Sequence, residues 1–156
     1  MHTEPYEMLA AAICKQAAED FRAARDTIGV ARLRDDEERI QVGLDRAEEC
    51  RRFFRGNACM ILANADGKYI LAELEKEWKE PRRYDLFSSM AQAKEKYATF
   101  RRVCDEENAR RVADTENRPK KLRPLSFDKW LKAEPDHHFV DPDPLGFDPT
   151  SRKCRA

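Results

Sequence analysis

The stretch PYEMLAAAICKQAAEDFRAARDTIG, residues 5–29, decides the fold class of this chain. Its apolar side chains recur every three or four positions, at Tyr6, Leu9, Ile13, Ala17, Phe21, Ala24 and Ile28. This spacing places them on one face of an α-helix. Thr3 is the expected N-cap, Pro5 suits the first turn because its missing N–H is not needed there, and Gly29 is the expected C-terminal cap.

The same periodicity continues through the next 50 residues or so. Residues 35–55 form a second predicted helix, with acidic side chains at its start and arginines at its end, as the helix dipole favours. The apolar run at residues 58–63 is interpreted as a short helix because its neighbours are helical and the chain offers no strand to pair with it. Asp66 is the expected N-cap of the following helix, which Pro81 ends.

A long helix is predicted over residues 84–116. Its apolar positions alternate spacings of four and three, a heptad-like seam formed by Leu86, Met90, Ala93, Tyr97, Phe100 and Cys104. We expect this seam either to form a homodimer through Met90, Tyr97, Phe100 and Cys104 or to pack within the chain.

The composition changes at Arg118, after which six of the eight prolines occur. Closely spaced prolines prevent long helices, so residues 118–156 are predicted to be an extended arm with one short helix near 126–133. The predicted architecture is therefore all-α: a bundle of four to five helices over residues 1–117, including one long helix, followed by a proline-rich C-terminal arm.

The composition of the chain indicates its expected location in the cell. The chain has 156 residues and a net charge of zero, from 30 basic and 30 acidic side chains. Its five cysteines are widely spaced and form no CxxC pair, which favours reduced thiols and a cytoplasmic location. The longest apolar run, residues 8–14, is shorter than the ~20 residues that span a bilayer, so no membrane association is expected.

No catalytic site is expected. The sequence has no GxSxG, no glycine-rich phosphate loop and no HExxH, and its histidines are His2, His137 and His138. The cluster around Asp136, His137 and His138 lacks the spacing of a metal site. We therefore expect a protein that is not an enzyme and has no cofactor, metal or catalytic residue.

The arm holds the predicted partner-binding residues. Residues 118–134 contain six basic and two acidic side chains, and two aromatic side chains lie among them. Either these residues bind nucleic acid through residues 118–132, by phosphate attraction and stacking, or the aromatic side chains dock the arm onto the helices, which we favour. The arm is also the part of the chain predicted to engage a partner. Its aromatic side chains could therefore be buried against another molecule instead of against the protein's own helices. Its proposed contact residues are Phe127, Trp130, Leu131, Lys120, Lys121 and Arg123.

Residues 52–74 resemble a motif of small helical phage and prophage proteins. The resemblance rests on Arg52-Phe53-Phe54, on Leu62, on Asp66-Gly67-Lys68-Tyr69-Ile70-Leu71 and on Leu74. In those proteins a helix ending in FF leads through a short apolar turn to DGEYL and an amphipathic helix. Here Lys68 replaces the usual glutamate, and Gly56-Asn57-Ala58 departs from the family pattern. The resemblance covers the N-terminal half and brings no cofactor or chemistry with it.

The resemblance implies a non-enzymatic protein in a phage or prophage setting that binds and inhibits a host or defence protein. An anti-CRISPR-like inhibitor is the sharpest form of this hypothesis. Two alternatives come from the residues themselves. One is a nucleic-acid-binding accessory protein that uses the basic arm, and the other is a structural helical oligomer built on the long helix.

Overall fold

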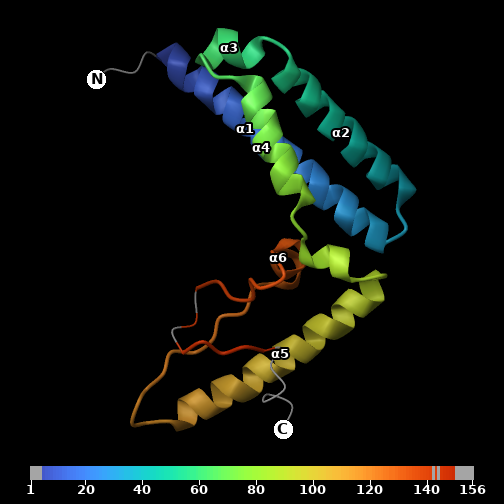
Figure 1. Cartoon of the computed structure of the whole chain (residues 1–156). Helices are drawn as coiled ribbons and strands as arrows, with labels where there is room; N and C mark the ends of the chain where they lie inside the picture. The colour runs from blue at the N-terminus through green and yellow to red at the C-terminus, as the bar shows by residue number, and fades with distance from the viewer. Residues whose placement is uncertain (1–4, 142, 144, 150–156) are drawn as a thin grey trace. The chain divides into compact units, whose positions relative to one another are not determined.

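The computed structural model describes residues 5–141, 143 and 145–149. These residues form six α-helices and one 3₁₀-helix and contain no named strand (Figure 1). Contacts within the chain divide it into two compact units, residues 1–81 and residues 82–156, which we call unit 1 and unit 2. The all-α class expected from the sequence is confirmed for the described residues.

Unit 1 consists of four helices. They are α1 (Pro5–Leu33), α2 (Glu37–Arg55), α3 (Ala58–Ala63) and α4 (Gly67–Lys79). Helices α1 and α2 pack together as an antiparallel pair, and α4 contacts both of them. The interpretation of residues 58–63 as a helix is confirmed.

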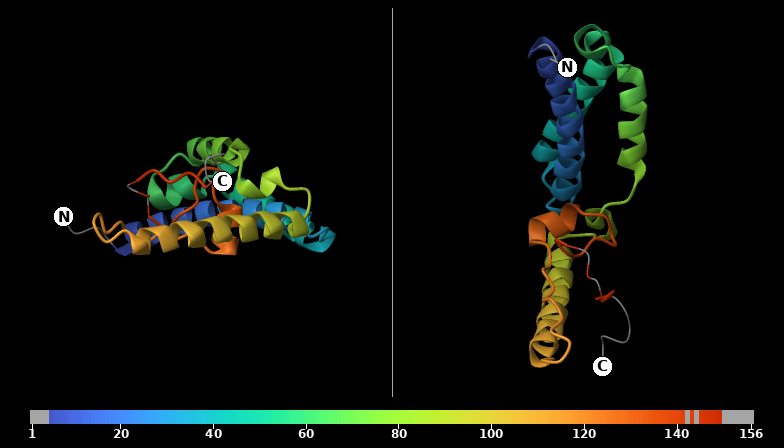
Figure 2. Two further views of the ribbon diagram at one scale, coloured as in Figure 1. Left: turned by 90° about the horizontal axis from the view of Figure 1, so that it is seen from below. Right: turned by 90° about the vertical axis from the view of Figure 1, so that its left-hand side faces the viewer.

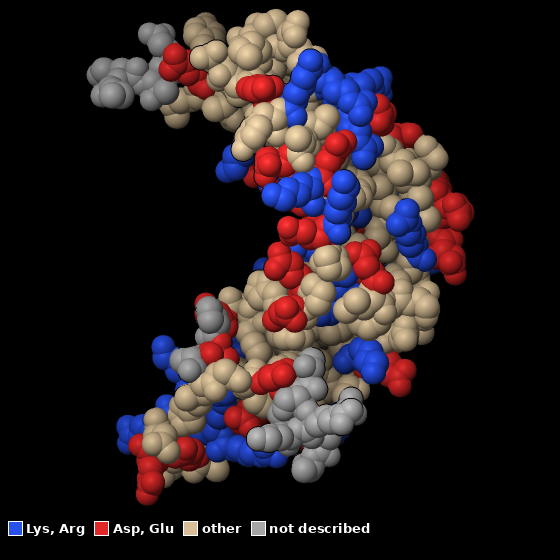
Figure 3. Space-filling model, in the orientation of Figure 1, with Lys and Arg blue, Asp and Glu red and all other residues tan. Residues whose placement is uncertain are grey.

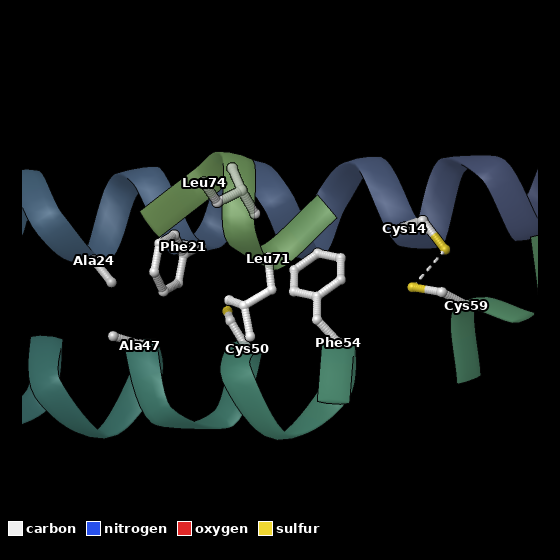
Figure 4. Close-up of a cluster of buried hydrophobic side chains, with 9 residues drawn as sticks. All are labelled: Cys14, Phe21, Ala24, Ala47, Cys50, Phe54, Cys59, Leu71 and Leu74. Carbon is white, nitrogen blue, oxygen red and sulfur yellow. Dashed lines mark hydrogen bonds between the residues drawn. The ribbon is translucent and has the colours of Figure 1, made fainter. Parts of the chain in front are cut away.

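The core of unit 1 lies between α1, α2 and α4. Phe21 from α1, Phe54 from α2 and Leu71 from α4 point into this space, as Figure 4 shows. Ala24 and Ala47 lie on facing sides of the α1–α2 pair and have no exposed surface. Small side chains at these positions allow the two helices to approach closely.

Local capping explains most helix boundaries in unit 1. The Asp66 carboxylate accepts hydrogen bonds from the backbone N–H groups of Lys68 (3.0 Å) and Tyr69 (3.3 Å), so the predicted N-cap of α4 is confirmed. The prediction that Gly29 caps α1 is wrong: the helix continues to Leu33, and Gly29 is a buried position within it. The additional turn buries Leu33, and the chain then turns at Asp35, whose φ is 53°. Thr3 lies outside the described residues.

Unit 2 contains η1 (Arg83–Leu86), α5 (Met90–Ala113) and α6 (Phe127–Lys132). The long helix is thus shorter than the predicted 84–116. It begins at Met90 because the Ser89 hydroxyl accepts a hydrogen bond from the N–H of Gln92 (3.2 Å), and Ser89 has extended backbone. The residues before it form a separate 3₁₀ turn.

The described part of the arm returns along α5 and is hydrogen-bonded to it at separate positions along the helix. The Tyr97 hydroxyl donates to the carbonyl of Leu125 (2.7 Å), and the Asn108 side chain bonds both the N–H and the carbonyl of Leu122 (2.6 and 3.1 Å). One antiparallel bridge joins Pro124 to Phe139 within the arm. Both views in Figure 2 show the arm beside α5.

These contacts make the arm part of unit 2. The change of composition predicts a domain boundary after residue 117, whereas the contacts of the structure divide the chain after Pro81. The difference arises because α5 contacts its own arm, a long-range pairing that leaves no local pattern in the sequence. Among the described residues, no helix has both the length and the apolar character that a membrane crossing requires.

Candidate functional site

The predicted partner-binding residues divide into a buried group and an exposed group. Trp130 and Leu131 are 4% and 1% exposed, and Phe127 is half-buried. The basic residues of the set, Lys120, Lys121 and Arg123, are exposed. Trp130 and Leu131 are therefore buried against the protein's own helices and not left free for another molecule. In this structure they are core residues of unit 2.

An aromatic cluster surrounds Trp130. The Trp130 ring is stacked with the rings of Phe87 and Phe100, at centroid separations of 5.8 and 6.0 Å. Its centroid is 5.2 Å from that of the Tyr97 ring. Phe100 also contacts His138. Phe100 and Tyr97 belong to the heptad-like seam of α5, so in this structure the arm covers part of the seam predicted as a possible homodimer contact.

Arg83 connects η1 to the loop after α6. Its guanidinium donates to the carbonyls of Trp130, Glu134 (3.1 Å), Pro135 (2.7 Å) and His137 (2.9 Å), and its carbon lies 4.5 Å from the Trp130 ring centroid. Burial lowers the pKa of Arg83 to about 10. No carboxylate among the described residues forms an ion pair with it, so this buried cation is held by carbonyl oxygens. Sequence reasoning missed Arg83 because no motif distinguishes it from 29 other basic residues.

A cavity of about 800 Å³ opens beside this cluster, entirely within unit 2. Phe87, Phe100 and Trp130 contribute apolar walls. Lys96 and Arg102 bring positive charge to it from α5. Among the described lining residues, Glu106 is the one acidic side chain, and its carboxylate is 3.1 Å from Arg102.

The indole Nε1 of Trp130, one of the residues that line the cavity, is buried and has no acceptor among the described residues. The tautomer of His138 follows from its contact with Arg83: Nδ1 of His138 is 3.3 Å from Nη2 of Arg83, and a guanidinium can only donate, so Nδ1 accepts and Nε2 carries the proton. Burial, and then the charge of Arg83, lower the pKa of His138 to about 4, so the ring is neutral at pH 7.

Unit 1 carries a different feature, an exposed apolar surface that we call the apolar end. It combines the first turns of α1 with α3, which contact one another. Tyr6 is 82% exposed and Ile61 is 77% exposed. Figure 3 shows uncharged side chains gathered at the end of unit 1 that holds α3. The residues of the apolar end are Tyr6, Leu9, Ile13, Met60, Ile61 and Leu62.

Groups that could perform chemistry are few. The thiols of Cys14 and Cys59 are buried and 3.3 Å apart (Figure 4), and desolvation raises the pKa of Cys59 to about 12, so this thiol is protonated and a poor nucleophile at neutral pH. Within the described residues, no group of three His, Cys, Asp or Glu side chains has an arrangement that could hold a metal ion.

Comparisons with protein-family models, with curated proteins and with solved structures found no match for this chain.

Proposed function

We propose that this protein acts by binding a partner protein through the apolar end of unit 1, without catalysing a reaction. One observation carries the proposal. The apolar stripe of α1 is buried from Phe21 onward but uncovered at Tyr6, Leu9 and Ile13. Because exposed apolar clusters of this kind mark interaction sites in soluble proteins, the uncovered part of the stripe is the contact surface we propose.

The shape of the surface suggests the kind of partner. Its side chains come from two contacting helices, with Leu9 and Ile13 at helical spacing on one and Ile61 and Leu62 adjacent on the other. Such a surface accepts the apolar face of an amphipathic helix, which contributes anchors three or four residues apart. The proposed partner therefore presents an amphipathic helix.

Inhibition of a host or defence protein in a phage setting is the finer form of this proposal, with an anti-CRISPR-like inhibitor as its sharpest version. Its support is the resemblance of residues 52–74 to the phage motif. In the structure this motif forms the end of α2, the whole of α3 and the first turns of α4. Part of the apolar end, Met60 to Leu62, lies inside it.

Nucleic-acid binding by the arm is the weaker candidate. Lys120, Lys121 and Arg123 are exposed and could contact phosphate groups. However, the Trp130 ring, which a single-stranded nucleic acid would need for stacking, is buried against Phe87 and Phe100.

Site-specific photocrosslinking tests the protein-binding proposal. A benzophenone amino acid replaces Ile61 in the apolar end or, as a matched control, the exposed Val42 on α2. In cells of the source organism we expect a discrete adduct from position 61 and none from position 42. The partner identified by crosslinking is then purified, and its affinity for this protein is measured. The affinity should fall at least tenfold when this protein carries Leu9→Asp and should stay unchanged when it carries Val42→Asp.

Two results would overturn the proposal: no adduct at position 61, or equal binding by the Leu9→Asp and Val42→Asp variants. An adduct formed with a second copy of this chain would replace the foreign partner by self-association. Light scattering of the purified protein would identify that case.

A further inference from the structure

Two buried thiols of unit 1 lie in contact although they come from distant parts of the chain. Cys14 belongs to α1 and Cys59 to α3, 45 positions later, and their sulfur atoms are 3.3 Å apart (Figure 4). A disulfide bond needs about 2.05 Å between its sulfur atoms, so the two thiols have to approach each other by only roughly 1.3 Å. The fold therefore holds this pair close to bonding geometry.

The contact is important for α3 because Cys59 anchors this helix. Cys59 is the one buried residue among the six of α3, all of which the structure describes, and its exposed fraction is 0%. The N-cap residue Asn57 forms no side-chain hydrogen bond with the helix. Since a helix of six residues is too short to be stable alone, α3 depends on its packing against the rest of unit 1.

We infer that Cys14 and Cys59 form a reversible disulfide bond when the protein meets a peroxide oxidant, and that this bond ties α3 to α1. The three exposed residues that follow Cys59, residues 60–62, belong to the apolar end. The bond therefore fixes this part of the apolar end to α1. The inference concerns the chemistry of unit 1 alone and does not depend on the partner proposed for that surface.

The reaction starts at Cys14, since this residue is 8% exposed whereas Cys59 has no exposed surface. The Cys14 thiolate attacks one oxygen of hydrogen peroxide and the O–O bond breaks. Cys14 becomes a sulfenic acid, and the other oxygen leaves as hydroxide and takes up the Cys14 proton to form water. The Cys59 sulfur then attacks the Cys14 sulfur, the S–O bond breaks, and the hydroxyl group leaves with the Cys59 proton as a second water. The two thiols lose two electrons, and the peroxide accepts them.

The second step needs the proximity that the fold provides. Burial raises the pKa of the Cys59 thiol to about 12, which makes it a weak nucleophile. Two groups that a fold holds in contact nevertheless react at effective concentrations far above those of separate molecules. Buried cysteines also pack together as ordinary apolar side chains, so reactivity toward peroxide is the property that separates the two cases.

The test uses the full reduced chain, treated with hydrogen peroxide at mildly alkaline pH, where more thiolate is present, either folded or unfolded in urea. Remaining thiols are then alkylated, and mass spectrometry of a trypsin digest identifies linked peptides. The diagnostic pair joins residues 1–15 to residues 56–68, which contain one cysteine each. We expect this pair to be at least tenfold more abundant than any other in the folded protein, to lose that excess in urea and to disappear with dithiothreitol.

Amide hydrogen exchange measures the effect on α3. Oxidation should slow exchange at the hydrogen-bonded amides of Ile61, Asn64 and Ala65 at least tenfold, since closing a chain segment of 45 positions usually stabilises by more than this factor. Cys14→Ser should abolish both the linked peptide and the slower exchange. Cys50→Ser is the matched control and should leave both unchanged, because it removes a buried thiol of α2 that forms no hydrogen bond with another thiol in the described part of the chain.

The native protein alone decides the inference, so it stays testable if a variant fails to fold. The inference is wrong if the folded protein gives no such linked peptide, if the pair is equally abundant in urea, or if the linked protein exchanges at α3 as fast as the reduced one.

Discussion

Because Gly67 has no side chain, the two helices α2 and α4 can pack closely together at this position. A Cβ atom at this position would lie 2.4 Å from the carbonyl oxygen of Phe54, a distance that backbone atoms cannot accommodate without moving. The start of α4 therefore packs directly against the end of α2. Phe54 thus fills the core of unit 1 while its carbonyl approaches Gly67.

Gly67→Ala should accordingly destabilise unit 1. We expect the free energy of unfolding to fall by about 1–3 kcal/mol, since overpacking forces the backbone to shift. Gly56→Ala is the control, because a Cβ atom there meets only ordinary contacts of 3.4 Å or more. Urea denaturation followed by circular dichroism measures both variants, and equal midpoints would contradict the close approach.

His138 makes the stability of unit 2 depend on pH. Its folded-state pKa of about 4 lies below the ordinary value near 6.5, because burial and Arg83 disfavour the charged ring. The unfolded chain therefore binds a proton more readily than the folded chain does. The contribution of neutral His138 to stability is complete above pH 6.5 and is lost as the pH falls toward about 4.

We expect the midpoint of thermal unfolding to decrease between pH 6.5 and 4, and His138→Asn to reduce this decrease. The asparagine side chain does not titrate, and its carbonyl oxygen is an acceptor of the kind that Arg83 needs. His137→Asn, at an exposed neighbouring position, should keep the native pH profile. A His138→Asn profile identical to the native one would show that this group does not carry the pH dependence.

The arm is fixed to α5 by a buried ion pair. Two nitrogens of Arg111 donate to the two carboxylate oxygens of Asp143 (3.1 and 2.9 Å), and both side chains are 4% exposed. These hydrogen bonds lower the pKa of Asp143 below its ordinary value. The arm carries a second, exposed pair between Arg123 and Asp141, at 3.3 Å and 69% exposure of both side chains.

The two pairs provide a matched comparison. Asp143→Asn leaves a buried cation without its main partner and should cost about 3 kcal/mol. Asp141→Asn breaks an exposed pair and should cost less than about 1 kcal/mol. Hydrogen exchange at residues 118–126 measures the local effect, which should be large for Asp143→Asn only. Similar exchange rates in the two variants would show that Arg111 does not hold the arm.

The two units have separate cores, so destabilisation of one should leave the other folded. Phe54 is fully buried in unit 1, and Trp130 is buried in unit 2. Phe54→Ala should cost about 3–5 kcal/mol in unit 1, and Trp130→Ala a similar amount in unit 2. Leu74→Ala, also in the core of unit 1, should cost about 2–5 kcal/mol.

Urea titrations followed by NMR distinguish the units, because signals from residues 5–81 and from residues 82–141 are observed separately. Phe54→Ala should lower the unfolding midpoint of the first set only, and Trp130→Ala that of the second set only. A common midpoint for both sets in either variant would show that the chain unfolds as one cooperative body.

The helical elements of this protein are determined by its sequence alone. Apolar spacing of three and four residues marks α1, α2 and α4, and the N-cap at Asp66 is visible in the one-dimensional pattern. These features are local, since each depends on residues no more than about four positions apart. The existence of the long helix is predicted from the sequence, although the observed α5 begins six residues later and ends three residues earlier than the predicted 84–116, and the short helix of the arm is also expected.

Which apolar side chains are covered was decided only by the tertiary structure. Tyr6 and Phe21 belong to the same stripe of α1, yet Tyr6 is exposed and Phe21 is buried. Trp130, Arg83 and His138 come together from η1, α6 and the loop after it, and the cavity of unit 2 exists only once they meet α5. Burial of a side chain depends on partners 30 to 55 positions away in the sequence, such as His138 for Arg83, and periodicity does not report contacts over that separation.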